Sequence, residues 1–511
     1  MNEPGDLHIQ QSSAANVPES TLAPLKPLET TLNNPRPTEI SSNILARNEE
    51  TPPSLDHGDT LDSRPQADTH DLPQIQTYEI SSSYIRKLPN ELTSEIFQCC
   101  LVGPISIPWR VEMAPLNLSQ VCSRWRQIAL ATGILWADIA IVIDAELYGA
   151  VGFAATGVEI IRRCGQSLIS LRLELTGDWL LSSTQPFTEI LLSNASRWKR
   201  LFLSGRLEWL EPFFALPPGS VDSLQVLEVR NEGPTSLSSL PLVQGAKSLS
   251  EFICSHNMTA EAISCLPLSQ LTSLHLLRVL MGSDTLLSVL NQCTSLVQGV
   301  FVVRSQDIDP HTTTQPSACT LPLLKTLYII LMCPGDFGWL QWLNLPSLAH
   351  FELTAQLGAP FISSLVPTIS SSRRLRTLCL CVIISPSDLE EILEAAPLLV
   401  TLEVIRGRML SRSVLDRMAS GELVPQLASL FCAIEALDGL SPHLDMLESR
   451  KEETTPAAHI DEVTFYDEIR GNFHSEDLLG LGRVQRLVKD GWDITSPWTD
   501  GLSEASFPVS M

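Results

Sequence analysis

The feature that most constrains the fold of this chain is a leucine pattern that recurs from about residue 141 onward. The pattern is Leu-x-x-Leu-x-Leu with conservative replacements, and eleven intervals between Leu168 and Ile460 give roughly 26–27 residues per repeat. Such a period is typical of solenoids in which each repeat packs only against its neighbours. Clear copies begin at Leu168, Leu224, Leu249, Leu271, Leu324, Leu348, Leu375 and Leu399, and weaker ones at Trp198, Leu296, Leu427 and Ile460.

The alternation within Leu-x-Leu predicts a short strand that points its leucines inward. The segments between these strands resemble helix starts, most clearly Ser385-Pro386-Ser387-Asp388, and also 259–265 and 284–290. Strand then helix, repeated, predicts an α/β solenoid with a parallel sheet on its concave face and helices on its convex face. An all-helical solenoid is the competing fold, but the partly β-branched runs 327–333 and 378–384 favour strands.

Residues 84–140 follow a different, helical pattern. Two stretches, 84–101 and 116–136, are predicted to be helical, with an insertion at 102–115 that holds three prolines. Apolar residues recur at helical spacing, and Gly133 is predicted to end the second stretch. The two stripes are Leu92, Ile96, Phe97 and Cys100, then Leu118, Val121, Cys122, Trp125, Ile128 and Ala129.

These residues resemble a known family. The segments Leu-Pro-x-Glu-Leu-x-x-x-Ile-Phe, Leu-x-x-Val-Cys-x-x-Trp-Arg-x-Ile-Ala and Leu-Trp occur in that order and resemble an F-box, closest to the F-box-like domains of fungal proteins. The resemblance implies binding to the Skp-type adaptor of a cullin ubiquitin ligase. The insertion at 102–115 departs from a compact F-box. The residues implied to carry the contact or its supporting core are Leu88, Pro89, Leu92, Ile96, Leu118, Val121, Trp125 and Trp136.

The repeats resemble those of irregular intracellular leucine-rich-repeat proteins. They depart from the consensus because Asn257 alone supplies the asparagine expected three residues after the last leucine. In each strand, the residue between the two leucines and the residue after the second are predicted to face the hollow. The residues predicted to bind a target protein there are Arg172, Phe202, Glu228, Arg230, His275, Tyr328, Glu352 and Glu403, beside Glu174, Cys379, Cys381 and Tyr466.

Composition and charge indicate how the rest of the chain is organised. Residues 1–80 hold 13 acids, 4 bases and ten prolines, so they are predicted to be a disordered acidic tail. The expected organisation is therefore a tail at 1–80, an F-box-like domain at 84–140, a solenoid at 141–495 and a frayed end at 496–511. The formal net charge of −24 argues against nucleic-acid binding. The chain has no signal-peptide pattern and no apolar run that could span a membrane, which predicts an intracellular protein, cytoplasmic or nuclear.

No motif in the sequence predicts an enzyme. Phosphate-binding loops, His-Glu-x-x-His, Gly-x-Ser-x-Gly and Cys-x-x-Cys are all absent from the sequence, so no cofactor or metal is expected. We therefore expect a substrate-recognition subunit of an SCF-type cullin ubiquitin ligase. The alternative is a leucine-rich-repeat scaffold with no ubiquitin role, in which the helices cap the repeats. Exposure of the apolar face of 84–101 would distinguish the two.

Overall fold

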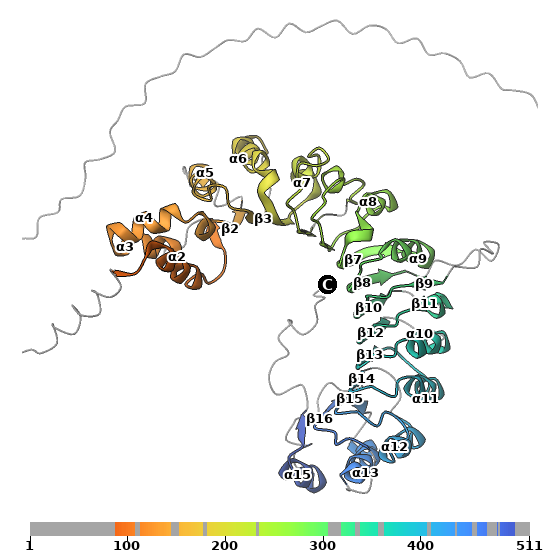
Figure 1. Ribbon diagram of the computed structural model, residues 1–511. Helices are drawn as coiled ribbons and strands as arrows, with labels where there is room; N and C mark the ends of the chain where they lie inside the picture. Colours follow the sequence, from red (N-terminus) through yellow and green to blue (C-terminus); the bar gives the residue numbers. More distant parts are fainter. Residues whose placement is uncertain are drawn as a thin grey trace, which may run out of the picture. The chain divides into compact units, whose positions relative to one another are not determined.

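The computed structural model describes a helical segment followed by a long parallel sheet with helices along one side (Figure 1). The described residues are 87–107, 113–144, 153–176, 181–230, 233, 235–304, 318–332, 338–355, 362–405, 410–434, 437–451, 457–467, 478 and 481–495. The tail predicted at 1–80 and the frayed end predicted at 496–511 lie outside them.

Fifteen parallel strands of the described chain form one sheet, and their order follows the sequence. The α/β repeat solenoid predicted from the leucine pattern is therefore confirmed. The strands are β1 (Ile105–Ile107), β2 (Asp138–Asp144), β3 (Ile169–Thr176), β4 (Trp198–Ser204), β5 (Val226–Arg230), β6 (Glu251–Cys254), β7 (Ser273–Met281), β8 (Gln298–Val303), β10 (Thr326–Leu331), β12 (His350–Ala355), β13 (Thr377–Cys381), β14 (Thr401–Val404), β15 (Ser429–Ile434), β16 (Glu462–Asp467) and β17 (Asp493–Thr495). A two-stranded sheet pairs β9 (Cys319–Thr320) with β11 (Leu343–Asn344).

Backbone hydrogen bonds connect neighbouring repeats where the consensus would supply asparagine side chains. Just before a strand begins, a backbone amide donates to a carbonyl of the preceding repeat. Examples are the amides of Lys325, Ala349 and Arg376, which donate to the carbonyls of Val297, Lys325 and Ala349 respectively, each at 2.8 Å. Backbone groups buried between repeats must be paired somewhere, and here the main chain pairs them itself. The scarcity of asparagine in the sequence is thus compatible with a continuous solenoid.

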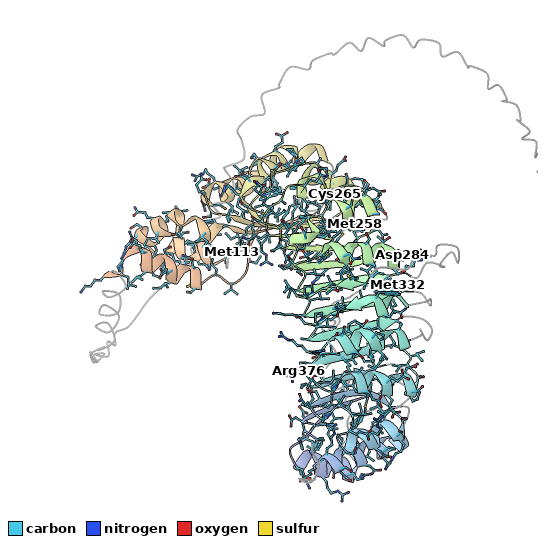
Figure 2. The ribbon with its side chains drawn as sticks, turned by 45° about the vertical axis from the view of Figure 1, so that its right-hand side comes forward. Met113, Met258, Cys265, Asp284, Met332 and Arg376 are labelled. Carbon is cyan, nitrogen blue, oxygen red and sulfur yellow. The ribbon has the colours of Figure 1, made fainter. Side chains whose placement is uncertain are left out.

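Helices lie on the side of the sheet opposite the hollow, on the outside of the curve (Figure 1). In Figure 2, Asp284 at the start of α9 lies on this side, whereas Arg376 lies at the strands. Ser385 caps α11 as predicted, its Oγ accepting from the Asp388 amide at 3.1 Å. The helices are α5 (Phe153–Arg163), α6 (Leu181–Ser193), α7 (Leu207–Phe214), α8 (Ala260–Ser264), α9 (Ser283–Gln292), α10 (Val366–Ser371), α11 (Pro386–Ala395), α12 (Arg412–Ala419), α13 (Ser441–Arg450) and α15 (Gly482–Lys489).

The helical segment, residues 87–136, contains α2 (Asn90–Cys99), α3 (Ala114–Val121), α4 (Ser123–Ala131) and the 3-10 helix η1 (Gly133–Trp136). The second predicted helical stretch is therefore divided, because Cys122 is extended (φ −159°, ψ 169°) and caps α4, its Sγ accepting from the Trp125 amide in the first turn. Helix α4 ends at Ala131 with Thr132 as its C-cap, close to the end predicted at Gly133, and Gly133 opens η1. A Cβ at Gly133 would come within 2.5 Å of the Cys164 carbonyl oxygen, so this close approach needs glycine.

The insertion at 102–115 contributes a strand that sequence analysis did not foresee. Within it, β1 pairs in parallel with β2 and forms the first strand of the solenoid sheet. Strand β2 in turn runs across residue 140, where the boundary between helical domain and solenoid was expected. The helical segment and the repeats therefore share one sheet.

A buried arginine holds the C-terminal repeats together. Arg450, at the end of α13, donates to five backbone carbonyls, those of Met418, Leu423, Val424, Leu427 and Ala458, at 2.7–3.3 Å. Loss of water lowers the pKa of its guanidinium to about 10, so the group stays charged at neutral pH. It stabilises the turn at 423–427 through hydrogen bonds to the main chain.

Candidate functional site

The helical segment is built on an aromatic core. Phe97 of α2 is fully buried and meets the Trp125 ring edge-on, with centroids 4.9 Å apart. Trp136 is also fully buried, and its Nε1 donates to the Ala129 carbonyl at 2.8 Å. The guanidinium of Arg163, from the first repeat, lies 4.6 Å from the Trp136 ring centre. This core fixes the positions of α2, α4 and η1.

Other apolar side chains of the same segment point to solvent. Leu92 and Ile96, one turn apart on α2, are 46% and 48% exposed, and Val121 at the end of α3 is 60% exposed. Pro89 is exposed too, while Leu88, Leu118 and Trp125 are half-buried. Isolated exposed leucines are ordinary, but several on one small helical unit indicate a contact surface. We call Leu92, Ile96 and Val121 the apolar face.

The predicted adaptor residues thus fall into two groups. The apolar face is open, whereas Trp136 is enclosed and can only support it. Val102, between α2 and β1, is exposed as well, and sequence analysis did not name it as a contact residue. Beyond Cys122 it also missed two exposed apolar side chains, Leu130 of α4 and Ile134 of η1. Their signal was hidden because the break at Cys122 changes which residues of α4 share a face with those of α3.

Polar contacts lock α2 against α4. The guanidinium Nη2 of Arg124 donates to Asn90 Oδ1 at 2.9 Å, and it also binds the Leu88 carbonyl. At the far end of the helices, Ser94 Oγ and Thr132 Oγ1 share a hydrogen bond of 3.1 Å. These contacts hold the first sequence motif, on α2, against the second, on α4.

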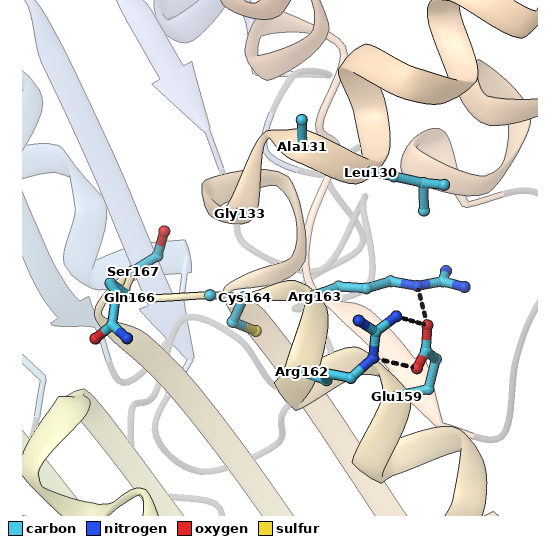
Figure 3. Close-up of a pocket in the computed structure, with 10 residues that line it drawn as sticks. Leu130, Ala131, Gly133, Glu159, Arg162, Arg163, Cys164, Gln166 and Ser167 are labelled. Carbon is cyan, nitrogen blue, oxygen red and sulfur yellow. Dashed lines mark hydrogen bonds and ion pairs between the residues drawn. The ribbon is translucent and has the colours of Figure 1, made fainter.

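A hollow of about 630 Å³ lies where the helical segment meets the first repeat (Figure 3). Its wall includes Leu130, Gly133 and the end of α5, where Glu159 accepts hydrogen bonds from Arg162 at 2.7 Å and Arg163 at 2.9 Å. The bond to Arg162 lowers the pKa of Glu159 to about 2. Because the guanidinium groups of Arg162 and Arg163 are both already paired with Glu159, we interpret this hollow as part of the junction between the helical segment and the first repeat.

The concave sheet face brings together seven of the eight residues predicted to bind a target. They hold equivalent register positions and form one row across the sheet, in which Ile253, Val300 and Cys379 hold the same position on the strands between them. Arg230 lies two residues beyond this row. The row contains Arg172 of β3, Phe202 of β4, Glu228 of β5, His275 of β7, Tyr328 of β10, Glu352 of β12 and Glu403 of β14.

The N-terminal end of this row combines arginines with an aromatic ring. The guanidinium groups of Arg172 and Arg230 lie 4.5 Å and 5.2 Å from the centre of the Phe202 ring. Arg230 pairs with Glu228 at 2.9 Å, and Arg172 pairs more loosely with Glu174 at 3.7 Å. Arginine and aromatic side chains dominate the energetics of protein interfaces, so this end is suited to contact.

The C-terminal end of the row is acidic. Burial, together with nearby Glu403, raises the pKa of Glu352, and burial is the main cause that raises the pKa values of Tyr328 and Tyr466. His350 lies beside Tyr328, with ring centroids 5.0 Å apart, and burial lowers its pKa. Sequence analysis missed His350 because it precedes the Leu-x-Leu pair by one residue.

The described residues offer no arrangement typical of catalysis. Burial raises the pKa of Cys164 and Cys319 to about 11 and that of Cys254 and Cys432 to about 12, so these thiols are poor nucleophiles. Within the described ranges, no three His, Cys, Asp or Glu side chains are grouped as metal ligands would be. Nor does any described helix have the length and apolarity needed to cross a membrane.

Comparison with known proteins gives one family. Residues 85–142 match the family model described as F-box-like. No curated protein matched the chain. Among solved structures, an internalin from Listeria monocytogenes is similar over 65% of this chain and 81% of its own, with 12% identity and a TM-score of 0.32. A protein from Bacteroides fragilis is similar over 65% of each chain, with 12% identity and a TM-score of 0.24. The fold assignment rests on strand order and register.

Proposed function

We propose that this chain is the substrate-recognition subunit of an SCF-type cullin ubiquitin ligase. The helical segment would bind a Skp-type adaptor, and the concave sheet face would bind a target protein. The observation that carries the proposal is the apolar face. Leu92, Ile96 and Val121 are exposed within the segment that matches the F-box-like model.

The division of side chains within the helical segment supports docking. An ordinary cap would turn its apolar stripe onto the first repeat, whereas here Phe97 and Trp136 face inward and Leu92 and Ile96 face outward. Burying such side chains against a partner contributes about 25 cal/mol for each Å² of apolar surface removed from water. The same face is where the motif places adaptor-binding residues.

Ligation chemistry would take place on other subunits. The chain would hold its target near the ubiquitin-conjugating enzyme, so that a bimolecular encounter becomes a local one. The shared sheet supports this role, because pairing of β1 with β2 joins the adaptor-binding helices to the target-binding strands. An intracellular location, in cytoplasm or nucleus, follows from the proposal.

One observation favours the alternative, a repeat scaffold with no ubiquitin role. Strand β1 covers the edge of β2, and an N-terminal cap of a solenoid does the same. Both roles can belong to one segment, so the apolar face decides between them. A scaffold would not need Leu92 and Ile96 exposed.

Co-purification of the full chain with a Skp-type adaptor tests the proposal. The wild-type chain is expected to form a complex, and Leu92→Asp and Val121→Asp are each expected to abolish it, because a charge at a desolvated apolar contact is costly. Leu323→Asp is the matched control, since Leu323 is 51% exposed and lies in the repeats. Circular dichroism would verify folding. No complex with the wild-type chain, or equal binding by all three variants, would refute the proposal.

A further inference from the structure

A small pocket opens on the concave face where the helical segment joins the repeats. It has a volume of about 200 Å³ and is lined by strands β2 to β5 and by Pro104 of the insertion. Its polar wall includes Asp138, Arg172, Arg200 and Glu228, and its apolar wall includes Phe202. We call it the arginine pocket. The insertion that interrupts the helical motif therefore helps to form a cavity on the target-binding side.

The two arginines of the pocket differ in what they already bind. Arg172 lies over Phe202 and makes a loose ion pair with Glu174 at 3.7 Å. Arg200 is exposed and makes no hydrogen bond or ion pair with any residue that the structure describes. A β-bulge at Lys199 brings Arg200 into register with Ser170, next to the row that contains Arg172. A guanidinium group in this position can donate two parallel N–H hydrogen bonds to an oxyanion in the pocket.

We propose that the arginine pocket binds a carboxylate side chain, Asp or Glu, of the target protein. The assignment rests on the proposed function, in which the concave face holds a target. The two oxygens of a carboxylate match the guanidinium fork of Arg200, and Arg172, stacked on Phe202, adds a second positive charge to the pocket wall. Pro104 would limit the pocket on the side of the helical segment.

The charges around the pocket favour a carboxylate over a phosphate group. Asp138 and Glu228 stand in the same wall as Arg172 and Arg200, so the pocket is formally balanced. A phosphate carries close to two negative charges at neutral pH and would be repelled more strongly by these acids than a carboxylate would. Desolvation raises the pKa of Asp138 while Arg200 and Arg172 lower it, which places both arginines within electrostatic reach of the pocket.

The test is selection of a displayed library of random peptides on the full-length chain. Peptides of about 12 residues would cross several strands at ~3.3 Å per residue. Selection on the wild-type chain is expected to enrich Asp or Glu at one fixed position. Arg200→Glu is expected to lose that enrichment and to favour Lys or Arg there. Arg374→Glu, an exposed site before β13, is the matched control and should select as wild type does.

Synthetic versions of one enriched peptide then define the occupant. Replacing its carboxylate residue by the matching amide should weaken binding about tenfold to a hundredfold, and Arg200→Gln should do the same. Tighter binding by a phosphoserine version would overturn the carboxylate assignment in favour of a phosphopeptide. Failure to obtain any peptide that depends on Arg200 would overturn the pocket itself. Adaptor binding is measured separately, so its loss would count against the proposed function and not against this pocket.

Discussion

The helical segment and the concave face of the repeats present opposite kinds of surface. The helical segment leaves the apolar side chains of Leu92, Ile96 and Val121 in water. The concave face buries its leucines on the far side of the sheet and presents charged and aromatic side chains in a row. Apolar faces give affinity through burial, whereas placed charges give selectivity and orientation. The difference suggests one constant partner and one selected partner.

The comparison is sharpest within helix α2, where neighbouring residues face opposite ways. Phe97 is fully buried against Trp125, while Ile96 is 48% exposed. Phe97→Ala is expected to lower the free energy of unfolding of the helical segment by about 4 kcal/mol, because it leaves a cavity. Ile96→Ala is expected to change it by less than about 0.5 kcal/mol.

Hydrogen exchange of the amides in 90–136 measures both variants in the intact chain. It is preferable to a single global melt, because repeat proteins can unfold in parts. Equal losses of protection in the two variants would show that Ile96 packs inside, which would remove the apolar face.

A buried charge in the repeats gives the next largest effect. Arg450→Met keeps an extended side chain but removes the donor to five carbonyls, so we expect a loss of about 3 kcal/mol in the C-terminal repeats. Urea unfolding followed by exchange at 410–467 would measure it. Arg374→Met, which alters an exposed side chain, is the control. A neutral Arg450→Met would mean that water satisfies those carbonyls.

The smallest expected effect is a dependence of stability on pH at Glu352. Burial and Glu403 raise the pKa of Glu352 in the folded chain, so the folded state keeps its proton where the unfolded state has lost it. This carboxyl therefore lowers stability as pH rises above its unfolded pKa of about 4.3. Glu352→Gln should stabilise the chain by about 0.5 kcal/mol at neutral pH, a small value because water screens the carboxylate.

That gain should vanish at about pH 3, well below the unfolded pKa, where the wild-type carboxyl is protonated in both states. Thermal melts across this pH range, with the exposed Glu391→Gln as control, would measure the difference. A gain that persisted unchanged at low pH would assign it to packing.

The leucine pattern predicted the repeats well because every repeat must bury leucines at the same positions of its strand. Each of the twelve pattern positions lies at the start of a strand or one or two residues before it, from β3 to β16, since each inward leucine needs the same sheet register. Strand β1 could not be predicted in this way. It has three residues, and its partner β2 lies beyond two helices, so nothing local in Ile105–Ile107 specifies the pairing.

The site was predicted less completely. The motif named Leu92, Ile96 and Val121, which the structure leaves exposed, but it could not separate them from enclosed Trp136, because all four are simply apolar in sequence. On the sheet, Arg200 was missed since the bulge at Lys199 shifts the register of β4 by one residue. Pro104 was read as part of an interruption, whereas it lines the arginine pocket.

A titration of purified Skp-type adaptor against the full chain tests the central claim, that the two surfaces serve separate partners. We expect the wild-type chain to bind and Ile96→Asp to bind at least about a hundredfold more weakly, since a desolvated charge costs several kcal/mol. Arg200→Glu should bind the adaptor as wild type does, because it alters only the concave face. Adaptor binding that is unaffected by Ile96→Asp, or that is lost with Arg200→Glu, would contradict the account.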